Sequence, residues 1–400
     1  MTDLPVLRLK PKMDPRRIRF GYPWVYDNEL VLDRRSKAIA PGSLGVLEDA
    51  GREPLALVAA NPGSRIAGRV LDRAGVTELT DDWFTERLSR ALALRSRLYD
   101  APFYRLVHAE ADGFPGVIID RFGDTAVVQP NAAWAEVHLD QLTAALVAVT
   151  GVTNVLKSAG GRARSLEGLD DRDAVLAGAA PDAPVPVPMN GATYMADLTG
   201  GQKTGLFYDQ RPNHAFAAGL AREARVLDVF SHVGGFALAA LAGGAASALA
   251  VDGSQPALDL ARDGAARSGL SDRFATRKGD AFDTLAALAE EGEAFDLVIC
   301  DPPAFAPSKK ALDAGLRAYE RVARLAAPLV APGGYLVLCS CSHAADLEKF
   351  RTACIRGIGR GLHQTGRSAQ LIQTGFAGPD HPIHPQLAES GYLKALTFRL

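Results

Sequence analysis

The chain has 400 residues, of which 48% are hydrophobic and 22% are charged. This composition supplies enough apolar side chains for the cores of two or three domains and excludes a disordered chain. Glycine (39 residues) and proline (24 residues) are too few for a collagen-like or low-complexity sequence. The net charge of −2 gives no overall positive field for nucleic acid, although a local basic cluster could still bind phosphates.

The cysteines and apolar runs bear on the cellular location. Cys300, Cys339, Cys341 and Cys354 form no C-x-x-C pair and no disulfide framework, so we expect a reduced, cytoplasmic protein. The histidines show no metal-ligand spacing, and we predict no metal. The N-terminus lacks the apolar segment of a signal peptide. The longest uncharged run, 233–251, is mostly alanine and glycine and predicts a buried helix and turn instead of a membrane span.

Residues 1–75 predict a small β-rich domain, because short apolar runs alternate with glycine, proline and asparagine turns. Residues 8–19 carry six basic residues and one acidic residue, a net charge of +5. Such a run is usually a solvated face, but beside an RNA-binding module it favours phosphate contacts. Tyr22 and Trp24 could stack on RNA bases, although isolated aromatic residues more often belong to a core.

The next segments predict a connecting helix over 76–98 and an α+β domain over 99–185. The apolar residues Phe84, Leu88, Leu92 and Leu98 have helical spacing. The middle domain has strand signals at 116–122, 125–130 and 152–159, and a helical stretch at 132–149. Residues 110–116 predict a turn. Four prolines in 181–188 predict a stiff, extended boundary.

From residue 186 to residue 400 the pattern predicts an α/β domain. Apolar runs alternate with alanine- and leucine-rich stretches long enough for crossover helices. Strands are predicted at 224–230, 247–254, 273–282, 295–303, 333–342 and 391–400. This alternation is typical of a doubly wound, Rossmann-like parallel sheet that binds ligands at the carboxyl ends of its strands.

Small and acidic residues stand where these strands end. Gly234 and Gly235 allow a tight turn and a close approach of a ligand to the backbone. Asp252 follows Asp228 by 24 residues, one βαβ unit, and its carboxylate suits a ribose diol. The G-x-G-x-x-G and Walker A motifs are absent, so the site suits a nucleoside without a pyrophosphate. With the Asp-Pro-Pro of the fourth strand, this arrangement resembles a class I S-adenosylmethionine methyltransferase.

The predicted cofactor-binding residues at the strand ends are Asp228, Phe230, Gly234, Gly235, Phe236, Asp252, Ser254, Asp280, Ala281, Phe282 and Pro302. Upstream of the first strand, Phe207, Asp209 and Arg211 are predicted to fold across the cofactor, with a solvated turn as the plainer alternative. Asp301 is predicted to read the exocyclic amine of a flipped base, with a strand-end cap as its alternative.

Two cysteines, Cys339 and Cys341, lie on the fifth strand and share one side of the sheet by alternation. Free cysteine often packs as a small hydrophobe, so both could be core residues. Cys341 lies closer to the carboxyl end, where ligands bind, and is the predicted nucleophile. Methylation at carbon 5 of cytosine needs a thiolate that adds to carbon 6 and makes carbon 5 nucleophilic.

Longer motifs bring the resemblance closer: the chain resembles the bacterial 23S rRNA cytosine-5 methyltransferase family. The matching segments are GYPWVY (21–26), NPGSRI (61–66), RLVHAEADGFPGVIIDRFGD (105–124), GQKTGLFYDQRPNH (201–214), VLDVFSHVGGF (226–236), DPPAFAPSK (301–309) and CSCS (339–342). The resemblance implies a PUA domain, an EEHEAD domain and a Rossmann-like methyltransferase domain. It also implies S-adenosylmethionine as donor, 23S ribosomal RNA as acceptor, and Cys341 as nucleophile.

The sequence departs from related enzymes at three places. Ala304 stands where many RNA cytosine-5 methyltransferases have a second cysteine, so product release cannot use a second thiol. His232 replaces an expected aromatic residue, and 261–270 lacks the asparagines usual after the second strand. These departures concern the fine contacts to the cofactor and the release step.

Two rival functions remain open at this stage. Asp-Pro-Pro followed by an aromatic residue, here Phe305 after an intervening alanine, resembles motifs of enzymes that methylate an exocyclic nitrogen of guanine or adenine. A catalytically silent RNA-binding protein is the other alternative. We expect no membrane partner, and a homodimer is left open.

Overall fold

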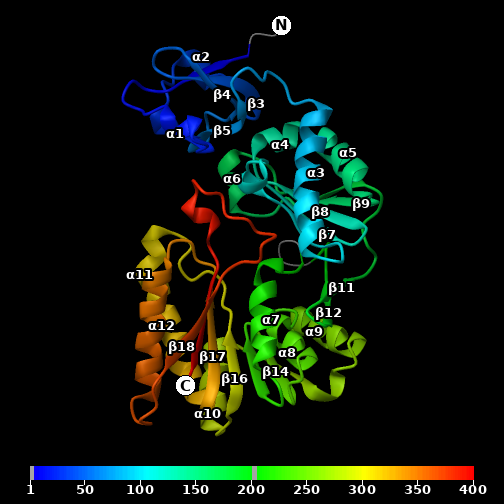
Figure 1. The fold of residues 1–400 in the computed structure, drawn as a ribbon, viewed down its shortest axis with the longest axis vertical. Helices are drawn as coiled ribbons and strands as arrows, with labels where there is room; N and C mark the ends of the chain where they lie inside the picture. Colours follow the sequence, from blue (N-terminus) through cyan, green and yellow to red (C-terminus); the bar gives the residue numbers. More distant parts are fainter. Residues whose placement is uncertain (1–3, 201–204) are drawn as a thin grey trace. The chain divides into compact units, whose positions relative to one another are not determined.

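The computed structural model describes residues 4–200 and 205–400. The chain forms two compact units (Figure 1). Unit 1 is Met1–Asp182 with Pro379–Ser390, and unit 2 is Ala183–Gly378 with Gly391–Leu400. The sequence assigned 186–400 to one domain, whereas the segment Pro379–Ser390 joins unit 1. Its anchor is Arg95, which is fully buried and donates a 2.7 Å hydrogen bond to the backbone oxygen of Asp380.

The N-terminal part of unit 1 is a five-stranded sheet in the order β1-β3-β4-β5-β2. Its strands are β1 (Val6–Arg8), β2 (Trp24–Tyr26), β3 (Ser43–Glu48), β4 (Pro54–Ala60) and β5 (Ile66–Arg73). The short helices α1 (Arg16–Arg19) and α2 (Arg34–Lys37) lie in its connections. Leu47 and Val58 are buried in its core, as the alternating apolar runs predict.

The basic run 8–19 is partly neutralised by acidic residues that are distant in the sequence. Arg8 pairs with Glu48 at 2.9 Å, and Arg17 pairs with Glu29 at 2.8 Å. The net charge of +5 counted along the chain therefore overstates the local positive field. Exposed ion pairs of this kind contribute little to stability, but they do lower the charge available to a phosphate.

The rest of unit 1 is an α+β fold with the sheet order β10-β9-β8-β7-β6. Its strands are β6 (Phe103–His108), β7 (Val117–Phe122), β8 (Thr125–Pro130), β9 (Asn154–Lys157) and β10 (Ala174–Ala177). Its helices are α3 (Asp81–Leu98), α4 (Ala133–Val137), α5 (Leu139–Thr150) and α6 (Arg162–Glu167). The sequence had not predicted β6 and β10, and the helix predicted over 132–149 is interrupted at His138.

Helix α3 is more than a connector, because its apolar face belongs to the core of this fold. Phe84 and Leu88 are completely buried, and the Trp83 ring contacts those of Phe114 and Trp134 edge-on. Leu98, which the spacing placed on the same face, is 39% exposed at the end of the helix. Burial of such aromatic and aliphatic side chains is the main stabilising contribution of a core.

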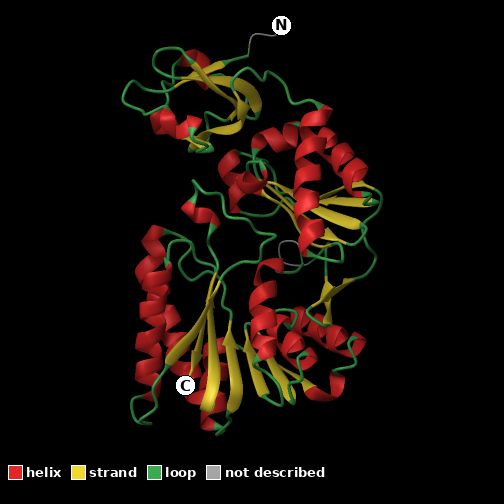
Figure 2. Ribbon diagram, viewed as in Figure 1, coloured by secondary structure: helices red, strands yellow, loops and turns green. Residues whose placement is uncertain are grey.

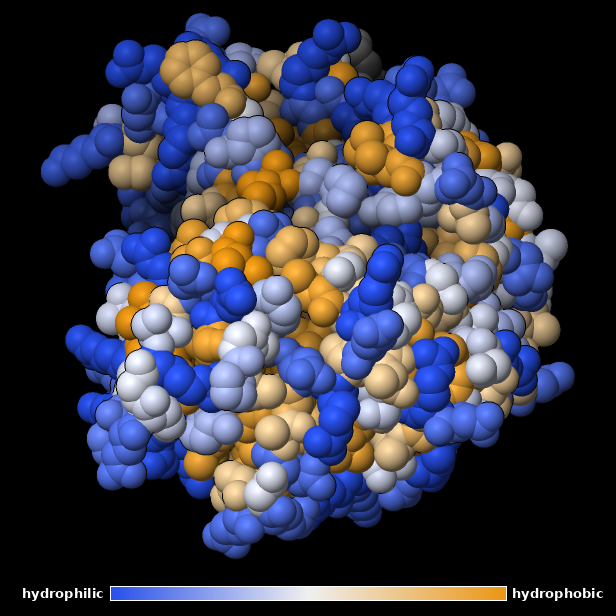
Figure 3. Space-filling model, turned by 60° about the horizontal axis from the view of Figure 1, so that its bottom comes forward, coloured by the Kyte–Doolittle hydropathy of each residue, from blue (hydrophilic) through white to orange (hydrophobic). Residues whose placement is uncertain are grey.

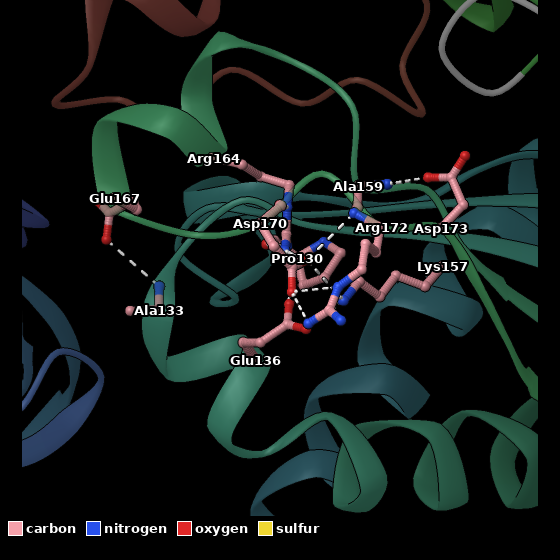
Figure 4. A network of polar contacts seen from close by, with 10 residues as sticks. All are labelled: Pro130, Ala133, Glu136, Lys157, Ala159, Arg164, Glu167, Asp170, Arg172 and Asp173. Carbon is pink, nitrogen blue, oxygen red and sulfur yellow. Dashed lines mark hydrogen bonds and ion pairs between the residues drawn. The ribbon is translucent and has the colours of Figure 1, made fainter.

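A buried arginine fastens α6 to the sheet (Figure 4). Arg164 donates hydrogen bonds to the backbone oxygen of Pro130 at 2.6 Å and to a carboxylate oxygen of Glu136 at 2.8 Å. Its Nε donates to the backbone oxygen of Asp170 at 2.8 Å. Lys157 pairs with the same Glu136. Because Arg164 is only 1% exposed, loss of one partner would leave a buried group unsatisfied.

Two glutamates connect the N-terminal sheet to the α+β fold within unit 1. Glu110 accepts hydrogen bonds from Nε1 of Trp24 at 2.7 Å and from Arg69 at 3.0 Å. Glu167 accepts from Arg69 at 3.0 Å and from Asn61, the first residue of the Asn-Pro-Gly-Ser motif. Trp24 is thereby a structural contact, and the turn predicted around Glu110 is the 3₁₀ turn Ala109–Asp112.

Unit 2 contains a seven-stranded sheet in the order β15-β14-β13-β16-β17-β19-β18. Its strands are β13 (Arg225–Val229), β14 (Ser247–Asp252), β15 (Phe274–Lys278), β16 (Phe295–Cys300), β17 (Val330–Ser340), β18 (Gln370–Gly375) and β19 (Lys394–Arg399). The first five are parallel, as predicted, but β19 runs antiparallel to both of its neighbours. The sequence had not predicted β18, whose Leu371 and Ile372 are exposed on the edge of the sheet.

Helices cover both faces of this sheet (Figures 1 and 2). One layer contains α7 (Arg211–Gly219), α8 (Gly235–Ala242) and α9 (Gln255–Arg267), and the other contains α10 (Ala281–Glu290), α11 (Leu312–Ala326) and α12 (Leu347–Leu362). The proline-rich segment forms strand β11 (Val185–Met189) of a hairpin with β12 (Ala192–Ala196). The carboxyl ends of the parallel strands converge on one edge, where an α/β sheet binds its ligands.

The uncharged run 233–251 contributes α8 and strand β14 to this layered core. Within the described residues, no helix combines the length and apolar character that crossing a membrane requires. The face drawn in Figure 3 mixes hydrophilic side chains with apolar ones.

Candidate active site

The turn after β13 has an unusual backbone, which the sequence supports with two glycines. Phe230 and His232 adopt positive φ angles of 63° and 49°, and Gly234 follows at 81°. At Gly235, a Cβ atom would lie 2.9 Å from the ring of His214, so this position has no room for a side chain. Backbone strain at non-glycine residues is concentrated in functional loops. The next residue, Phe236, is buried against the same His214 ring.

Several buried polar atoms beside this turn have no hydrogen-bond partner among the described residues. They include Oδ1 of Asp228, Oγ of Ser231 and Oδ1 of Asp209. Buried polar atoms are normally paired, so these atoms suit the polar groups of a ligand. The other Asp228 oxygen accepts the Ala237 N–H at 2.9 Å. Burial raises the pKa of Asp228 to about 7, and the Asp252 carboxylate also raises it.

Asp252 lies at the end of β14, next to the β13 turn. One of its carboxylate oxygens accepts the His232 N–H at 2.9 Å, and the other accepts the Ser254 N–H at 2.8 Å. The Ser254 hydroxyl in turn caps α9 by accepting the Ala257 N–H. Each carboxylate oxygen has a second acceptor site. The arrangement therefore orients Asp252 while it leaves capacity for the two hydroxyls of a ribose.

The residues predicted as an adenine wall combine a helix cap with an aromatic cluster. Asp280 is exposed and caps α10, because its side chain accepts the N–H groups of Phe282 and Asp283. The ring of Phe282 lies 6.2 Å from that of Phe305, which is 6.3 Å from that of Phe230. The structure thus brings together aromatic residues from three strand ends. The buried Ala281 is the first residue of α10, directly after the cap.

Asp301 follows β16 and lies among other acidic groups. Burial raises its pKa to about 8; the charges of Asp209 and Asp228 raise it as well, whereas the neighbouring Gln210 side chain lowers it. A raised pKa favours the protonated carboxyl, which can donate one hydrogen bond in addition to accepting others. Pro302, the next residue in the chain, is buried.

The segment before α7 contributes further groups, although its motif residues 201–204 lie outside the described part of the chain. The Phe207 ring lies 5.1 Å from that of His232 and so reaches the β13 turn. Asp209 accepts the hydroxyl of Tyr392 at 2.6 Å. The Arg211 guanidinium lies over the Tyr208 ring at 5.3 Å. Neither Gln210 nor Tyr392 was singled out in the sequence, although Gln210 stands inside the Asp-Gln-Arg motif.

The cysteines differ in their exposure. Cys300, Cys339 and Cys354 are buried, and burial raises the pKa of each thiol well above its ordinary value. Cys341 is partly exposed and stands one residue beyond the end of β17. A thiol must ionise and reach its target to act as a nucleophile, so Cys341 is the cysteine of this chain best placed for that role.

Hydroxyl groups hold the backbone on both sides of Cys341. The Ser340 hydroxyl donates to that of Tyr319 at 2.9 Å, and the Tyr319 and Ser342 hydroxyls are 2.7 Å apart. Ser342 also accepts the N–H of Ala306, in the loop after β16, at 3.0 Å. The loop with Asp301 and the loop with Cys341 are thus tied together. Tyr319 lies on α11, and no sequence motif identified it.

Lys394 is the other residue near Cys341 that sequence analysis missed. It begins β19, is 4% exposed, and donates from Nζ to the backbone oxygens of Ser342 at 2.7 Å and Ala345 at 2.8 Å. A single lysine directly before the apolar residues Ala395 and Leu396 of β19 was the available signal. No group of histidine, cysteine and acidic residues suited to a metal ion occurs in residues 4–200 and 205–400.

Comparisons with known proteins identify the family and the domains of the chain. A family model described as S-adenosylmethionine-dependent methyltransferase matches residues 138–371, and one described as PUA-like domain matches residues 7–73. A ribosomal RNA large subunit methyltransferase I from Alteromonas mediterranea is 34% identical, and the alignment covers 97% of each chain. A ribosomal RNA large subunit methyltransferase from Deinococcus radiodurans is 35% identical over 100% of this chain and 98% of its own.

Solved structures share the fold at low sequence identity. The structure of SMU.776, described as a methyltransferase complexed with SAH, superposes with a TM-score of 0.82 over 100% of both chains at 18% identity. A SAM-dependent methyltransferase structure from Streptococcus mutans gives the same TM-score and identity over 99% of this chain and 100% of its own.

Proposed function

The chain belongs to the ribosomal RNA large subunit methyltransferase I family and is an S-adenosylmethionine-dependent methyltransferase, and we propose that it methylates carbon 5 of a cytosine in large-subunit ribosomal RNA. The observation that carries the proposal is the position of Cys341. It is a partly exposed thiol just past the end of β17, in a loop tied to the Asp301 loop.

The proposed reaction uses Cys341 as a transient nucleophile. Its thiolate forms a bond from sulfur to carbon 6 of the cytosine, and the electron pair of the ring double bond becomes available at carbon 5. Carbon 5 then forms a bond to the methyl carbon of the donor, and the bond between that carbon and the donor sulfur breaks, with its electron pair left on the sulfur. A base removes the proton from carbon 5, the double bond returns, and the bond between sulfur and carbon 6 breaks. The methylated base and the Cys341 thiolate are thereby released.

The proposed donor site lies at the ends of β13, β14 and β15. S-adenosylmethionine supplies an electrophilic methyl group on a sulfonium. The Asp252 carboxylate would accept hydrogen bonds from its ribose hydroxyls. The unpaired oxygens of Asp228 and Ser231 would form hydrogen bonds with the polar groups of the donor. The aromatic residues Phe230 and Phe282 would flank the adenine.

Asp301 is proposed to recognise the target base. It lies at the neighbouring strand end, where a flipped base would meet both its carboxyl and the Cys341 thiol. Because its raised pKa favours the protonated form, this carboxyl would donate one hydrogen bond to the base and accept another from the exocyclic amine. A base without that pattern of donors and acceptors would leave this partly buried carboxyl unsatisfied, which gives selectivity.

A covalent trap tests the proposal. Ribosomal RNA carrying 5-fluorocytidine should form a stable enzyme–RNA adduct, because fluorine at carbon 5 cannot leave as a proton does. Cys341→Ala should abolish the adduct and methyl transfer while it still binds the donor. Cys339→Ala, the matched control, should retain most activity, because its thiol lies two residues deeper, roughly 6–7 Å along the strand. A trapped peptide containing Cys339, or an active Cys341→Ala enzyme, would contradict the mechanism.

The same experiment separates the second candidate function. Methylation of an exocyclic nitrogen of guanine or adenine needs no thiol, so a Cys341→Ser enzyme would remain active. The motif behind this alternative, Asp-Pro-Pro with a nearby aromatic residue, is present. However, its Phe305 ring packs 5.0 Å from the Tyr319 ring and near Phe230 and Phe282. That packing gives Phe305 a structural role in addition to any interaction with a base.

The N-terminal sheet is proposed to contact RNA phosphates. Lys12 is exposed, Arg16 retains 70% and Arg19 51% of side-chain exposure, and the nearby Phe20 is 73% exposed. An exposed aromatic ring beside cations suits stacking and phosphate contacts in single-stranded RNA. Deletion of residues 1–75 should weaken binding of ribosomal RNA and leave donor binding unchanged. Undiminished RNA binding would show that this module does not read RNA.

A further inference from the structure

Lys394 occupies a position that is unusual for a lysine. It pairs with Ser340 across the antiparallel β17–β19 ladder, one residue before Cys341. It is 4% exposed and is followed by the apolar residues of a central strand. Lysine is rarely buried unless its ammonium group has partners, because removing the charge from water is costly.

The partners of this ammonium are backbone carbonyls of the loop that follows the nucleophile. Nζ donates to the oxygens of Ser342 and Ala345 at 2.7 and 2.8 Å, and so spans the turn between Cys341 and α12. A lysine ammonium carries three donors, so these two bonds leave one for another acceptor. Within the described residues, no carboxylate forms an ion pair with Lys394. Its charge is therefore not neutralised by direct contact.

The electrostatic environment couples Lys394 to Cys341. Burial lowers the pKa of Lys394 to about 8, and the negative charges of Cys341 and Asp346 act in the opposite direction. Such an interaction is mutual: if the thiolate stabilises the ammonium, the ammonium stabilises the thiolate by the same free energy. The Tyr319 hydroxyl, on α11, bonds to the hydroxyls of Ser340 and Ser342, the residues on either side of Cys341. Burial and the negative charge of Cys341 both raise the pKa of the Tyr319 hydroxyl, so Tyr319 stays neutral and does not compete with Lys394 as a charge.

We propose that Lys394 is a positioning residue for Cys341, which fixes the loop after the nucleophile and favours its thiolate form through the ammonium charge. This inference rests on the proposed role of Cys341 and extends it. Proton removal from the thiol to solvent becomes easier while the neighbouring ammonium is positively charged. In its protonated form Lys394 already donates to two carbonyls. It therefore supplies a positive charge and holds the loop in place, and it is not itself the proton acceptor.

The test measures how the reactivity of Cys341 depends on pH, without RNA or donor. Iodoacetamide modifies the thiolate, and mass spectrometry of the peptide carrying Cys341 gives the rate at each pH from 6 to 10. Lys394→Met should move the midpoint upward by about one pH unit, the size expected when a nearby opposite charge is removed. Lys394→Arg, which keeps the charge, should stay near the wild-type midpoint.

A matched control separates this effect from a general loss of charge. Lys349→Met removes an exposed lysine that pairs with Asp346, and it should leave the midpoint unchanged. Lys394→Gln keeps an N–H donor but no charge, and it tests the proposal if the methionine variant fails to fold. An unchanged midpoint in both neutral variants would overturn the proposal. So would a rate that rises equally at every pH, because that result indicates only a loosened loop.

The assay stays informative if the proposed methyl transfer mechanism is wrong. Alkylation reports the Cys341 thiol directly, whereas methyl transfer by Cys341→Ala decides whether that thiol is the nucleophile. A shifted midpoint together with an active Cys341→Ala enzyme would support the coupling and reject the mechanism. A normal midpoint with an inactive Cys341→Ala enzyme would do the reverse.

Discussion

Asp228→Asn should remove a pH-dependent penalty that the native carboxyl imposes on the folded state. Asp228 is completely buried at the end of β13, and burial raises its pKa from 3.8 to about 7. The folded protein therefore binds this proton more tightly than the unfolded chain does. The contribution of this carboxyl to the free energy of unfolding is fully present below its ordinary pKa. It is lost as the pH rises toward the pKa that the group has in the folded protein. Asparagine is close in shape and keeps an oxygen for the Ala237 N–H, but it does not titrate.

The size of the effect follows from the two pKa values. Between pH 5 and pH 8 the wild-type protein should lose about 2 to 3 kcal/mol of stability through this one group, by proton linkage. The variant lacks this loss. Its stability relative to wild type should therefore increase by the same amount over that interval, even if it is lower at pH 5. Above pH 8 the difference should level off, since the carboxyl is then ionised in both states.

Hydrogen exchange of the donor-free protein, read on peptides of the neighbouring strand β16, measures this difference locally. At each pH, the ratio of the two exchange rates removes the intrinsic pH dependence. The relative protection of the variant should grow about 30- to 150-fold from pH 5 to pH 8. Asp346→Asn is the control. Lys349 lowers the pKa of the native Asp346 carboxyl, which is therefore ionised from pH 5 to pH 8, so the ratio of wild-type to variant exchange rates should remain constant. A constant ratio for Asp228→Asn would refute the reasoning.

Three further changes probe the donor site, the nucleophile loop and the RNA surface. Asp252→Ala should weaken S-adenosylmethionine binding roughly ten- to a hundred-fold in calorimetry, because a charge-assisted hydrogen bond is worth ~1.5–3 kcal/mol; unchanged affinity removes this residue from the site. Tyr319→Phe should cost about 1–3 kcal/mol in chemical unfolding, since it leaves buried serine hydroxyls without a partner. Replacing Arg16, Arg17 and Arg19 with glutamine should flatten the log–log salt dependence of RNA binding, by at most about 0.9 in slope for each phosphate that is no longer neutralised. An unaltered slope would place the RNA elsewhere.

Local patterns in the sequence were sufficient for much of the catalytic fold. The apolar runs ending at Asp228, Asp252, Asp301 and Cys341 all form strands of the parallel part of the sheet, and those residues stand at or just beyond the strand ends. The reason is that strand formation and the position of a strand end depend on neighbouring residues, while parallel strands necessarily bring their carboxyl ends to one edge. The acidic and glycine positions of the candidate site therefore follow from spacing alone.

Only the tertiary structure decided which distant residues meet. Lys394 lies 53 positions beyond Cys341, and nothing near it in the chain indicates that an antiparallel strand will insert beside β17. Likewise, Glu29 and Glu48 lie outside the basic run 8–19, and the pairing of strands brings them to it. Burial, charge neutralisation and pKa shifts depend on distances in space, which the order of residues does not specify. The sequence by itself therefore determined the strands and their ends, whereas the environment of the nucleophile was decided by long-range packing.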